Sequence, residues 1–166
     1  MSEAGLSMIE TAIAISIAGV LLCIAVPSFV KNLHASSFAE VTEGLGRLSE
    51  HAVAHAQRRP TEDAFPKSAP LTPETPPRAH KEKDPPGTWG NPTWIALDFQ
   101  ATVDGTPHAF SYAFDSTLGA EESSFAAHAH ADLDGDGQQS TFMVHGRAKA
   151  GAAVADPSMD VVLGLE

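Results

Sequence analysis

The sequence predicts an α+β fold in which one long N-terminal helix packs on a meandering antiparallel sheet of four or five strands. Three observations support this prediction. Residues 11–30 are uncharged and mostly aliphatic, the apolar residues that follow recur at helical spacings of three and four, and the C-terminal half alternates apolar and polar residues as strands do. The 166 residues suffice for one domain with an appendage, and the ordinary apolar fraction excludes wholesale disorder.

The N-terminal part of the predicted helix is long enough to cross a membrane. Residues 11–30 form a run of twenty uncharged residues, which at roughly 1.5 Å each span about 30 Å, the thickness of a bilayer hydrocarbon core. Glu10 lies at the mouth of this run, where an unpaired carboxylate costs a few kcal/mol, and Pro27 removes a backbone donor from the helix. Both residues argue against a plain membrane anchor, and the run is too long for a cleaved secretory signal.

The residues around Glu10 resemble the class III signal of type IV pilins and pseudopilins. The motif consists of Gly5-Leu6-Ser7-Met8-Ile9-Glu10, the apolar run and Pro27. The resemblance implies that a prepilin peptidase cuts after Gly5 and methylates the new N-terminus at Leu6. It further implies that Glu10 of an incoming subunit meets the N-terminus of its neighbour, and that Pro27 kinks the helix. The sequence departs from the family in having leucine where phenylalanine is usual after the cut, and in a short leader, residues 1–5, that lacks Lys and Arg.

The same resemblance implies a function and a location. The chain would be a structural subunit of a type IV pilus-like filament, held in the bacterial inner membrane by a single helix before assembly and extracellular afterwards. Its partners would be other pilins in a helical filament, the prepilin peptidase and the inner-membrane assembly platform. Two alternatives remain open: a pseudopilin in the periplasmic filament of a type II secretion system, and a membrane-anchored calcium-binding module.

Five segments are predicted along the chain. They are a leader at 1–5, a transmembrane or filament-core helix at 6–30, an amphipathic helix of the head at 31–59, a Pro-rich loop at 60–92 and an antiparallel sheet domain at 93–166. The amphipathic helix is predicted from one apolar stripe: Phe38, Val41, Leu45, Leu48 and Ala52. The Pro-rich loop holds nine of the twelve prolines and is expected to be an extended, partly disordered spacer.

Alternating apolar residues predict the strands of the sheet. The first two predicted strands are residues 95–99 and 110–114, with Asp104-Gly105 as the hairpin turn between them. Three further strands are predicted at residues 125–131, 141–145 and 159–163.

An acidic loop after the third of these strands is predicted to bind Ca²⁺. Three aspartates stand at alternate positions: Asp132, Asp134 and Asp136. Gly137 follows at the sixth position, as in the opening half of a calcium loop, while Gln138 would offer its backbone carbonyl and Ser140 its hydroxyl, directly or through water. Because Met143 stands where the closing glutamate would be, further oxygens must come from water or from other carboxylates: Asp115, Glu121, Glu122 and Asp156. The alternative is a solvated turn of Asp and Gly residues.

Composition and motifs exclude several function classes. The net charge is −11, and residues 93–166 contain eleven acidic and two basic side chains, which argues against nucleic acid as a direct ligand. Cys23 is the single cysteine, so no intrachain disulfide is possible. The sequence lacks an HExxH motif, a nucleophile elbow and a phosphate-binding glycine loop, so the chain is not expected to be an enzyme.

Two histidine pairs are weaker candidates for metal binding. His51 and His55 stand four residues apart on the predicted helix, a spacing that can hold zinc. Without a third ligand nearby in the sequence, they are expected to be exposed helix histidines. His128 and His130 share one face of a predicted strand and could form a soft-metal or pH-sensitive site.

Overall fold

The computed structural model describes residues 7–103 and 105–162, and within this range the side chains of residues 27–35 are left out of the description. Gly5 and Leu6 of the predicted cleavage site, Asp104 of the predicted turn, and residue 163 therefore lie outside the described residues. The chain divides into two compact units, Met1–Phe38 and Ala39–Glu166. We call them the N-terminal unit and the head.

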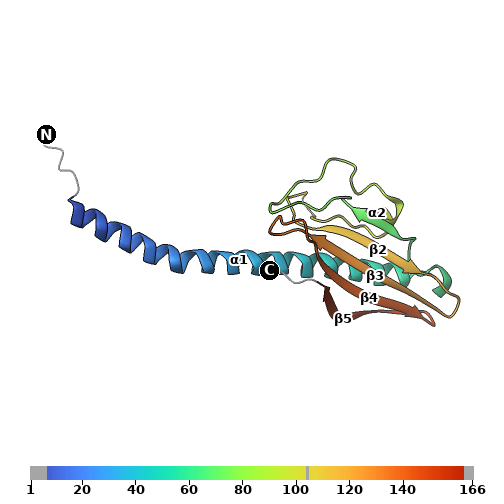
Figure 1. The fold of residues 1–166 in the computed structure, drawn as a ribbon. Coiled ribbons are helices and arrows are strands. Elements are labelled where there is room, and N and C mark those ends of the chain that lie inside the picture. The colour runs from blue at the N-terminus through green and yellow to red at the C-terminus, as the bar shows by residue number, and fades with distance from the viewer. Residues whose placement is uncertain (1–6, 104, 163–166) are drawn as a thin grey trace. The chain divides into compact units, whose positions relative to one another are not determined.

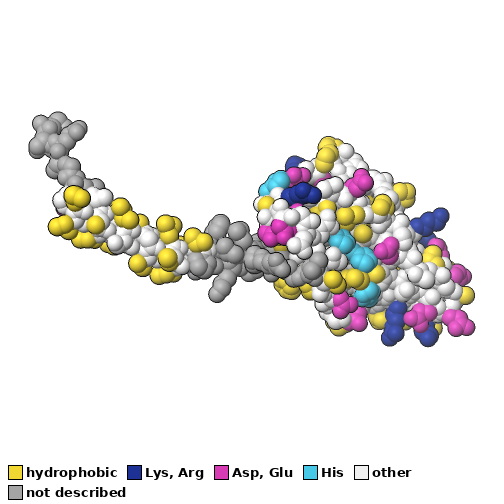
Figure 2. Space-filling model, in the orientation of Figure 1, with side chains coloured by type: hydrophobic (Ala, Val, Ile, Leu, Met, Phe, Trp, Pro, Cys, Tyr) yellow, Lys and Arg dark blue, Asp and Glu magenta, His cyan; other side chains and the backbone are white. Residues whose placement is uncertain are grey.

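Helix α1, Met8–Ala56, contributes to both units. Among the described residues its first part, Met8–Val26, is the one helix that is long and apolar enough to cross a membrane. Every residue of this part is exposed, and hydrophobic side chains dominate its visible surface (Figure 2). Its large apolar side chains are all more than half exposed: Met8, Ile9, Ile13, Ile15, Ile17, Val20, Leu21, Leu22, Ile24 and Val26. A helix with apolar residues on every face needs lipid or other protein around it.

The part of α1 that belongs to the head runs along one face of the sheet (Figure 1). Four residues of the predicted apolar stripe are fully buried, as expected: Val41, Leu45, Leu48 and Ala52. Phe38 was predicted to belong to the stripe, but its side chain is 44% exposed and it is not part of the buried core. The helix ends at Ala56, slightly before the predicted end at residue 59.

The sheet contains five antiparallel strands in the order β1-β2-β3-β4-β5. Their bounds are Ala69–Thr72, Ser111–Thr117, Glu122–Ala131, Ser140–Lys149 and Ala152–Val162. The α+β class and the antiparallel meander are therefore confirmed, with β2, β3 and β4 covering most of the positions predicted for them. β5 begins at residue 152, well before its predicted start at residue 159.

The predicted strand at residues 95–99 is wrong. A short helix, α2, occupies Pro92–Ala96, and the side chain of Asn91 caps it by accepting a hydrogen bond from the backbone N–H of Thr93 at 2.9 Å. A capping Asn followed by Pro at the first helical position is a strong helix start. The predicted hairpin at residues 104–105 therefore has no first strand. Of the alternating residues that suggested a strand, Leu97 and Phe99 are buried in the core, whereas Ile95 is 67% exposed.

The Pro-rich segment is also more ordered than predicted. It contains a 3₁₀ helix, η1, at Thr61–Asp63, and it supplies β1, which pairs with β2 through Ala69 opposite Phe114. Phe65 and Ala69 are almost fully buried in the core. The prolines prevent a long regular element, but the apolar residues between them anchor the segment on the rest of the head.

Candidate functional site

A reciprocal pair of hydrogen bonds closes the start of α1. The backbone N–H of Ser7 donates to Oε2 of Glu10 at 2.8 Å, and the backbone N–H of Glu10 donates to Oγ of Ser7 at 3.2 Å. This is a capping box, which satisfies two of the backbone N–H groups that a helix start leaves unpaired. Glu10 therefore has a hydrogen-bond partner within its own chain. A serine followed three residues later by glutamate is itself a capping-box signature, so this feature is readable from the sequence.

The other residues of the predicted pilin signal have no described contacts. Gly5 and Leu6 lie outside the described residues, and so does the side chain of Pro27. The helical bounds of α1 extend past residue 27. Within this motif, Ser7 and Glu10 are thus the residues whose side-chain geometry bears on function.

The acidic loop between β3 and β4 is organised by hydrogen bonds to its first aspartate. Oδ1 of Asp132 accepts from the N–H of Gly135 at 2.8 Å, and Oδ2 accepts from the N–H of Gly137 at 3.2 Å. The two glycines have φ angles of 83° and 93°, a region that residues with a side chain rarely adopt. The backbone bends at residues 133–137.

Three carboxylates converge in this loop. One oxygen each of Asp132, Asp134 and Asp136 lies within 4.8 Å of the others. Asp132 is buried, whereas the other two are exposed, and Nε of Arg78 lies 3.6 Å from Oδ2 of Asp132. Such oxygens are the ligands that hard cations such as Ca²⁺ and Mg²⁺ prefer. Arg78 supplies a positive charge beside the buried carboxylate, and no sequence pattern pointed to it.

The remaining predicted ligands differ in their relation to the loop. The backbone N–H of Gln138 donates to Asp136 at 2.6 Å and its side-chain amide donates to the same carboxylate at 3.1 Å, so Gln138 helps to hold that aspartate. Ser140 opens β4 opposite Ala131. The metal-ligand cluster found among the described residues includes none of the more distant carboxylates: Asp115, Glu121, Glu122 and Asp156.

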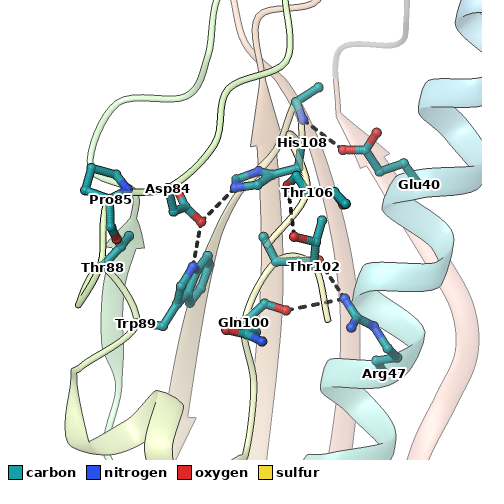
Figure 3. A network of polar contacts seen from close by, with 12 residues as sticks. Glu40, Arg47, Asp84, Pro85, Thr88, Trp89, Gln100, Thr102, Thr106 and His108 are labelled. Atoms are coloured by element: carbon teal, nitrogen blue, oxygen red, sulfur yellow. Dashed lines mark hydrogen bonds and ion pairs between the residues drawn. The ribbon is translucent and has the colours of Figure 1, made fainter. Parts of the chain in front are cut away.

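A polar network fastens the Pro-rich segment inside the head (Figure 3). Oδ2 of Asp84 accepts from Nε1 of Trp89 at 2.6 Å and lies 2.8 Å from Nε2 of the buried His108. Glu40 on α1 accepts from the backbone N–H of Ala109 at 2.8 Å. These partners are far apart in the sequence, so no motif could indicate them. Most of its polar groups bind one another, which indicates a structural role, although the buried Nδ1 of His108 has no hydrogen-bond partner among the described residues.

His51 and His55 on α1 are half-buried, not exposed as predicted. Nδ1 of His51 lies 2.7 Å from the carbonyl oxygen of Leu97 and 3.1 Å from that of Asp98. Nδ1 of His55 lies 2.9 Å from the carbonyl oxygen of Ala64. Both rings therefore connect α1 to segments that follow it in the sequence.

The second histidine pair, His128 and His130, shares one face of β3, as predicted, and this face is opposite the one whose residues are buried in the core. The rings of His128 and His130 stack with centroids 6.2 Å apart, and Nδ1 of His130 lies 2.9 Å from Oγ1 of Thr141. Nε2 of His128 lies 3.2 Å from a carboxylate oxygen of Asp115. Partial burial, and secondarily the neighbouring His128, lower the pKa of His130. Histidine side chains also gather on the visible face of the head in Figure 2.

Three features of the described residues thus bear on function. They are the capped and exposed apolar start of α1, the carboxylate cluster of the acidic loop, and the two histidine pairs. Comparisons of this chain with protein-family models, with curated proteins and with solved structures found no match.

Proposed function

We propose that this chain is a structural subunit of a type IV pilus-like filament, a major or minor pilin that a prepilin peptidase processes. The observation that supports it most is the start of α1. There the apolar segment Met8–Val26, in which every residue is exposed, begins directly at the Ser7–Glu10 capping box. The proposed cut after Gly5 would leave Leu6 and Ser7 in front of a complete helix.

The exposed apolar surface of Met8–Val26 supports a role in two successive environments. Each Å² of apolar surface removed from water contributes about 25 cal/mol, so this surface favours lipid or other protein over water. Before assembly, the bacterial inner membrane would cover it as a single-pass anchor. After assembly, the same helices of neighbouring subunits would cover it in the filament core, with the inner-membrane platform moving subunits between the two.

The head would form the outer surface of the filament. It is a compact unit whose own core is complete around α1 and the sheet, and its sheet region, residues 93–166, carries nine more acidic than basic residues. A charged, soluble surface suits the outside of an extracellular filament. The proposed activity is therefore assembly, with no chemical step and no direct contact with nucleic acid.

Glu10 would act in the monomer and again in the filament. In the single chain its carboxylate caps the helix. A carboxylate can accept about four hydrogen bonds, so the cap leaves room for a second partner, the protonated amino group at Leu6 of a neighbouring subunit. Charge pairs in a low-dielectric core depend strongly on both members, since removing one costs roughly 3–5 kcal/mol.

Two substitutions at Glu10 separate helix capping within the chain from charge pairing between subunits. Glu10→Gln keeps a side chain that can complete a capping box but removes the charge, whereas Glu10→Val removes both. We expect both variants to reach the membrane and both to enter filaments poorly, as measured by the ratio of sheared filament to membrane-bound subunit. If Glu10→Gln assembles as well as the wild type, the carboxylate acts only as a cap and the proposed pairing between subunits is wrong.

Mass spectrometry of the N-terminus of the cellular protein tests the proposed function itself. A chain that begins with methylated Leu6 is the expected result. Gly5→Val is the matched variant, because a branched side chain before the cut should block the peptidase and leave the full chain in the membrane. An intact Met1 in the wild type, or normal maturation of Gly5→Val, would contradict the pilin proposal.

The two alternatives make different predictions for the same samples. A type II secretion pseudopilin would be cut and methylated in the same way, but it would be found in a periplasmic filament. A membrane-anchored calcium-binding module would keep its N-terminus uncut and would not assemble.

We also propose that the acidic loop binds one Ca²⁺ through Asp132, Asp134 and Asp136. The convergence of three carboxylate oxygens within 4.8 Å supports this, because like charges at that distance repel one another and a cation removes the repulsion. Gln138 and Ser140 remain candidate ligands, and water would complete the coordination. With so few protein ligands, we expect weak affinity, towards the millimolar range of extracellular modules.

A further inference from the structure

We infer that His51 and His55 form a two-nitrogen binding site for a late transition-metal ion, for which Zn²⁺ is the probe of choice. The two residues are one helical turn apart on the head part of α1. Side chains at this spacing are neighbours on one helix face, and paired histidines four residues apart are the arrangement of helical zinc motifs. Both rings line one groove of about 600 Å³ between α1 and the end of α2. This site does not depend on the filament proposal.

Hydrogen bonds determine which ring nitrogen is available in each histidine. The contacts of Nδ1 in both rings are backbone carbonyl oxygens, which only accept hydrogen bonds. Nδ1 must therefore carry the proton in both rings. In the neutral imidazole the lone pair is then on Nε2, and the contacts described for these two rings involve Nδ1 alone.

The same hydrogen bonds are those that metal-binding histidines commonly make. A ligating histidine usually donates its second ring N–H to a carbonyl or a carboxylate, which fixes the tautomer and the ring orientation. His51 and His55 have this arrangement without a metal, through the carbonyls of Leu97 and Ala64. Because the backbone holds these carbonyls, both rings are oriented before a metal arrives.

The charges around the groove are compatible with a cation. Arg58, Arg59 and Asp98 all line the groove. The guanidinium of Arg59 is already paired with Asp63 at 2.6 Å. The two other charged residues that line the groove are of opposite sign, Arg58 positive and Asp98 negative. Among the described residues, no third His, Cys, Asp or Glu side chain joins His51 and His55 in a metal-ligand cluster. Water would therefore fill the remaining coordination positions. Imidazole nitrogen suits Zn²⁺, Cu²⁺ and Ni²⁺.

The histidine pair on the sheet is less suited to the same task. His128 uses Nε2 against the carboxylate of Asp115, and His130 faces the hydroxyl of Thr141, which can donate or accept. The Thr141 hydroxyl therefore does not determine which ring nitrogen of the neutral His130 carries the proton. This pair serves as the matched control for the helix pair.

The test is Zn²⁺ binding to the full chain in detergent micelles, measured by calorimetry with excess Ca²⁺ to occupy oxygen ligands. Gln can still donate to a carbonyl, so His51→Gln and His55→Gln preserve the hydrogen bonds that hold the fold. Each substitution should lower the Zn²⁺ affinity at least about tenfold. Losing a residue that only hydrogen-bonds to a metal ligand already costs about that much, and here the ligand itself is removed. His128→Gln and His130→Gln should leave the affinity unchanged. Equal affinity in the wild type and both helix variants would overturn the inference.

Two further measurements do not depend on the stability of those variants. In the wild type, Zn²⁺ should shift the Nε2 NMR resonances of His51 and His55 and leave their Nδ1–H protons in place; shifts confined to the sheet pair, or none, contradict the site. Arg58→Gln should bind Zn²⁺ at least as tightly as the wild type, because it removes a positive charge near a cation. A clear loss of affinity in Arg58→Gln would mean that the groove recruits anions instead.

Discussion

The two parts of α1 differ in what covers their apolar side chains. In Met8–Val26 every residue is exposed, whereas in the head one apolar stripe of the same helix is fully buried: Val41, Leu45, Leu48 and Ala52. The first part is apolar on all faces, so no single face of a sheet could cover it. The second part has one apolar stripe, which one sheet covers. The head therefore buries its apolar stripe within its own core, while the first part exposes apolar surface that favours lipid or other protein over water.

The largest difference between the two parts should appear when leucine is truncated. Leu45→Ala should destabilise the head by about 2–5 kcal/mol, the usual cost of a large-to-small change in a core. Leu22→Ala removes the same atoms from the exposed part and should leave the unfolding of the head unchanged. Denaturant unfolding of the full chain in detergent, followed by fluorescence of Trp89 and Trp94 in the head, measures both. A comparable loss in Leu22→Ala would mean that the N-terminal part stabilises the head.

Gly44 and Gly46 lie two residues apart in the head part of α1. Substituting each by alanine should change the stability of the head in opposite directions. A Cβ at Gly44 would lie 2.1 Å from the hydroxyl oxygen of the buried Tyr112, whereas a Cβ at Gly46 would have no atom within 4 Å. Gly44→Ala should therefore destabilise the head by about 1–3 kcal/mol through overpacking. Gly46→Ala should stabilise it by up to about 1 kcal/mol through helix propensity. Thermal unfolding of both variants is the measurement, and the same sign in both would contradict the close packing at Gly44.

Calcium should stabilise the head and leave the N-terminal unit unaffected. At a tenfold excess over the dissociation constant, a ligand of the folded state contributes about 1.4 kcal/mol, so Ca²⁺ should raise the melting temperature by several degrees. Mg²⁺ should do less, because it demands stricter coordination. Asp134→Ala should abolish the response, and Arg78→Gln should strengthen it, since Arg78 is the cation now beside Asp132. An equal shift in the wild type and Asp134→Ala would indicate general screening of the acidic head.

The smallest predicted effect is the pH dependence contributed by His130. Its pKa in the folded state is lowered, so between that value and about 6.5, the value in the unfolded chain, the unfolded state binds more protons. The head should therefore lose stability as the pH falls below about 6.5, with no further loss from this group below the folded pKa. His130→Gln should reduce the slope of stability against pH in this window. An unchanged slope would show that other groups produce the dependence.

Local patterns were sufficient for the elements whose determinants are adjacent in the sequence. The apolar run, the stripe from Val41 to Ala52 and the strands β3 and β4 were predicted because their periodicity reflects the faces that are buried. The three aspartates of the acidic loop were predicted together because they are separated by single residues. The capping box of Ser7 and Glu10 is equally local, although it was not predicted.

The errors arose where a distant partner decided the structure. The alternating apolar residues at 95–99 are compatible both with a strand and with a short helix followed by a loop. The cap at Asn91 and burial in the core favour the helix. The strand β1 lies in a segment rich in proline, which local propensity disfavours. It forms because β2 supplies its hydrogen-bond partners.

The membrane-length apolar helix, the α+β class and the carboxylate cluster were predictable from the amino-acid sequence, because each follows from the pattern of residues along one helix, one strand or one loop. The tertiary structure alone decided which segment forms the edge strand β1, and that Arg78 stands beside Asp132. It also decided which nitrogens of His51 and His55 are protonated, since the carbonyls of Leu97 and Ala64 lie in other segments. Those features depend on groups that only the folded chain brings within hydrogen-bonding distance, and no spacing in the sequence records that proximity.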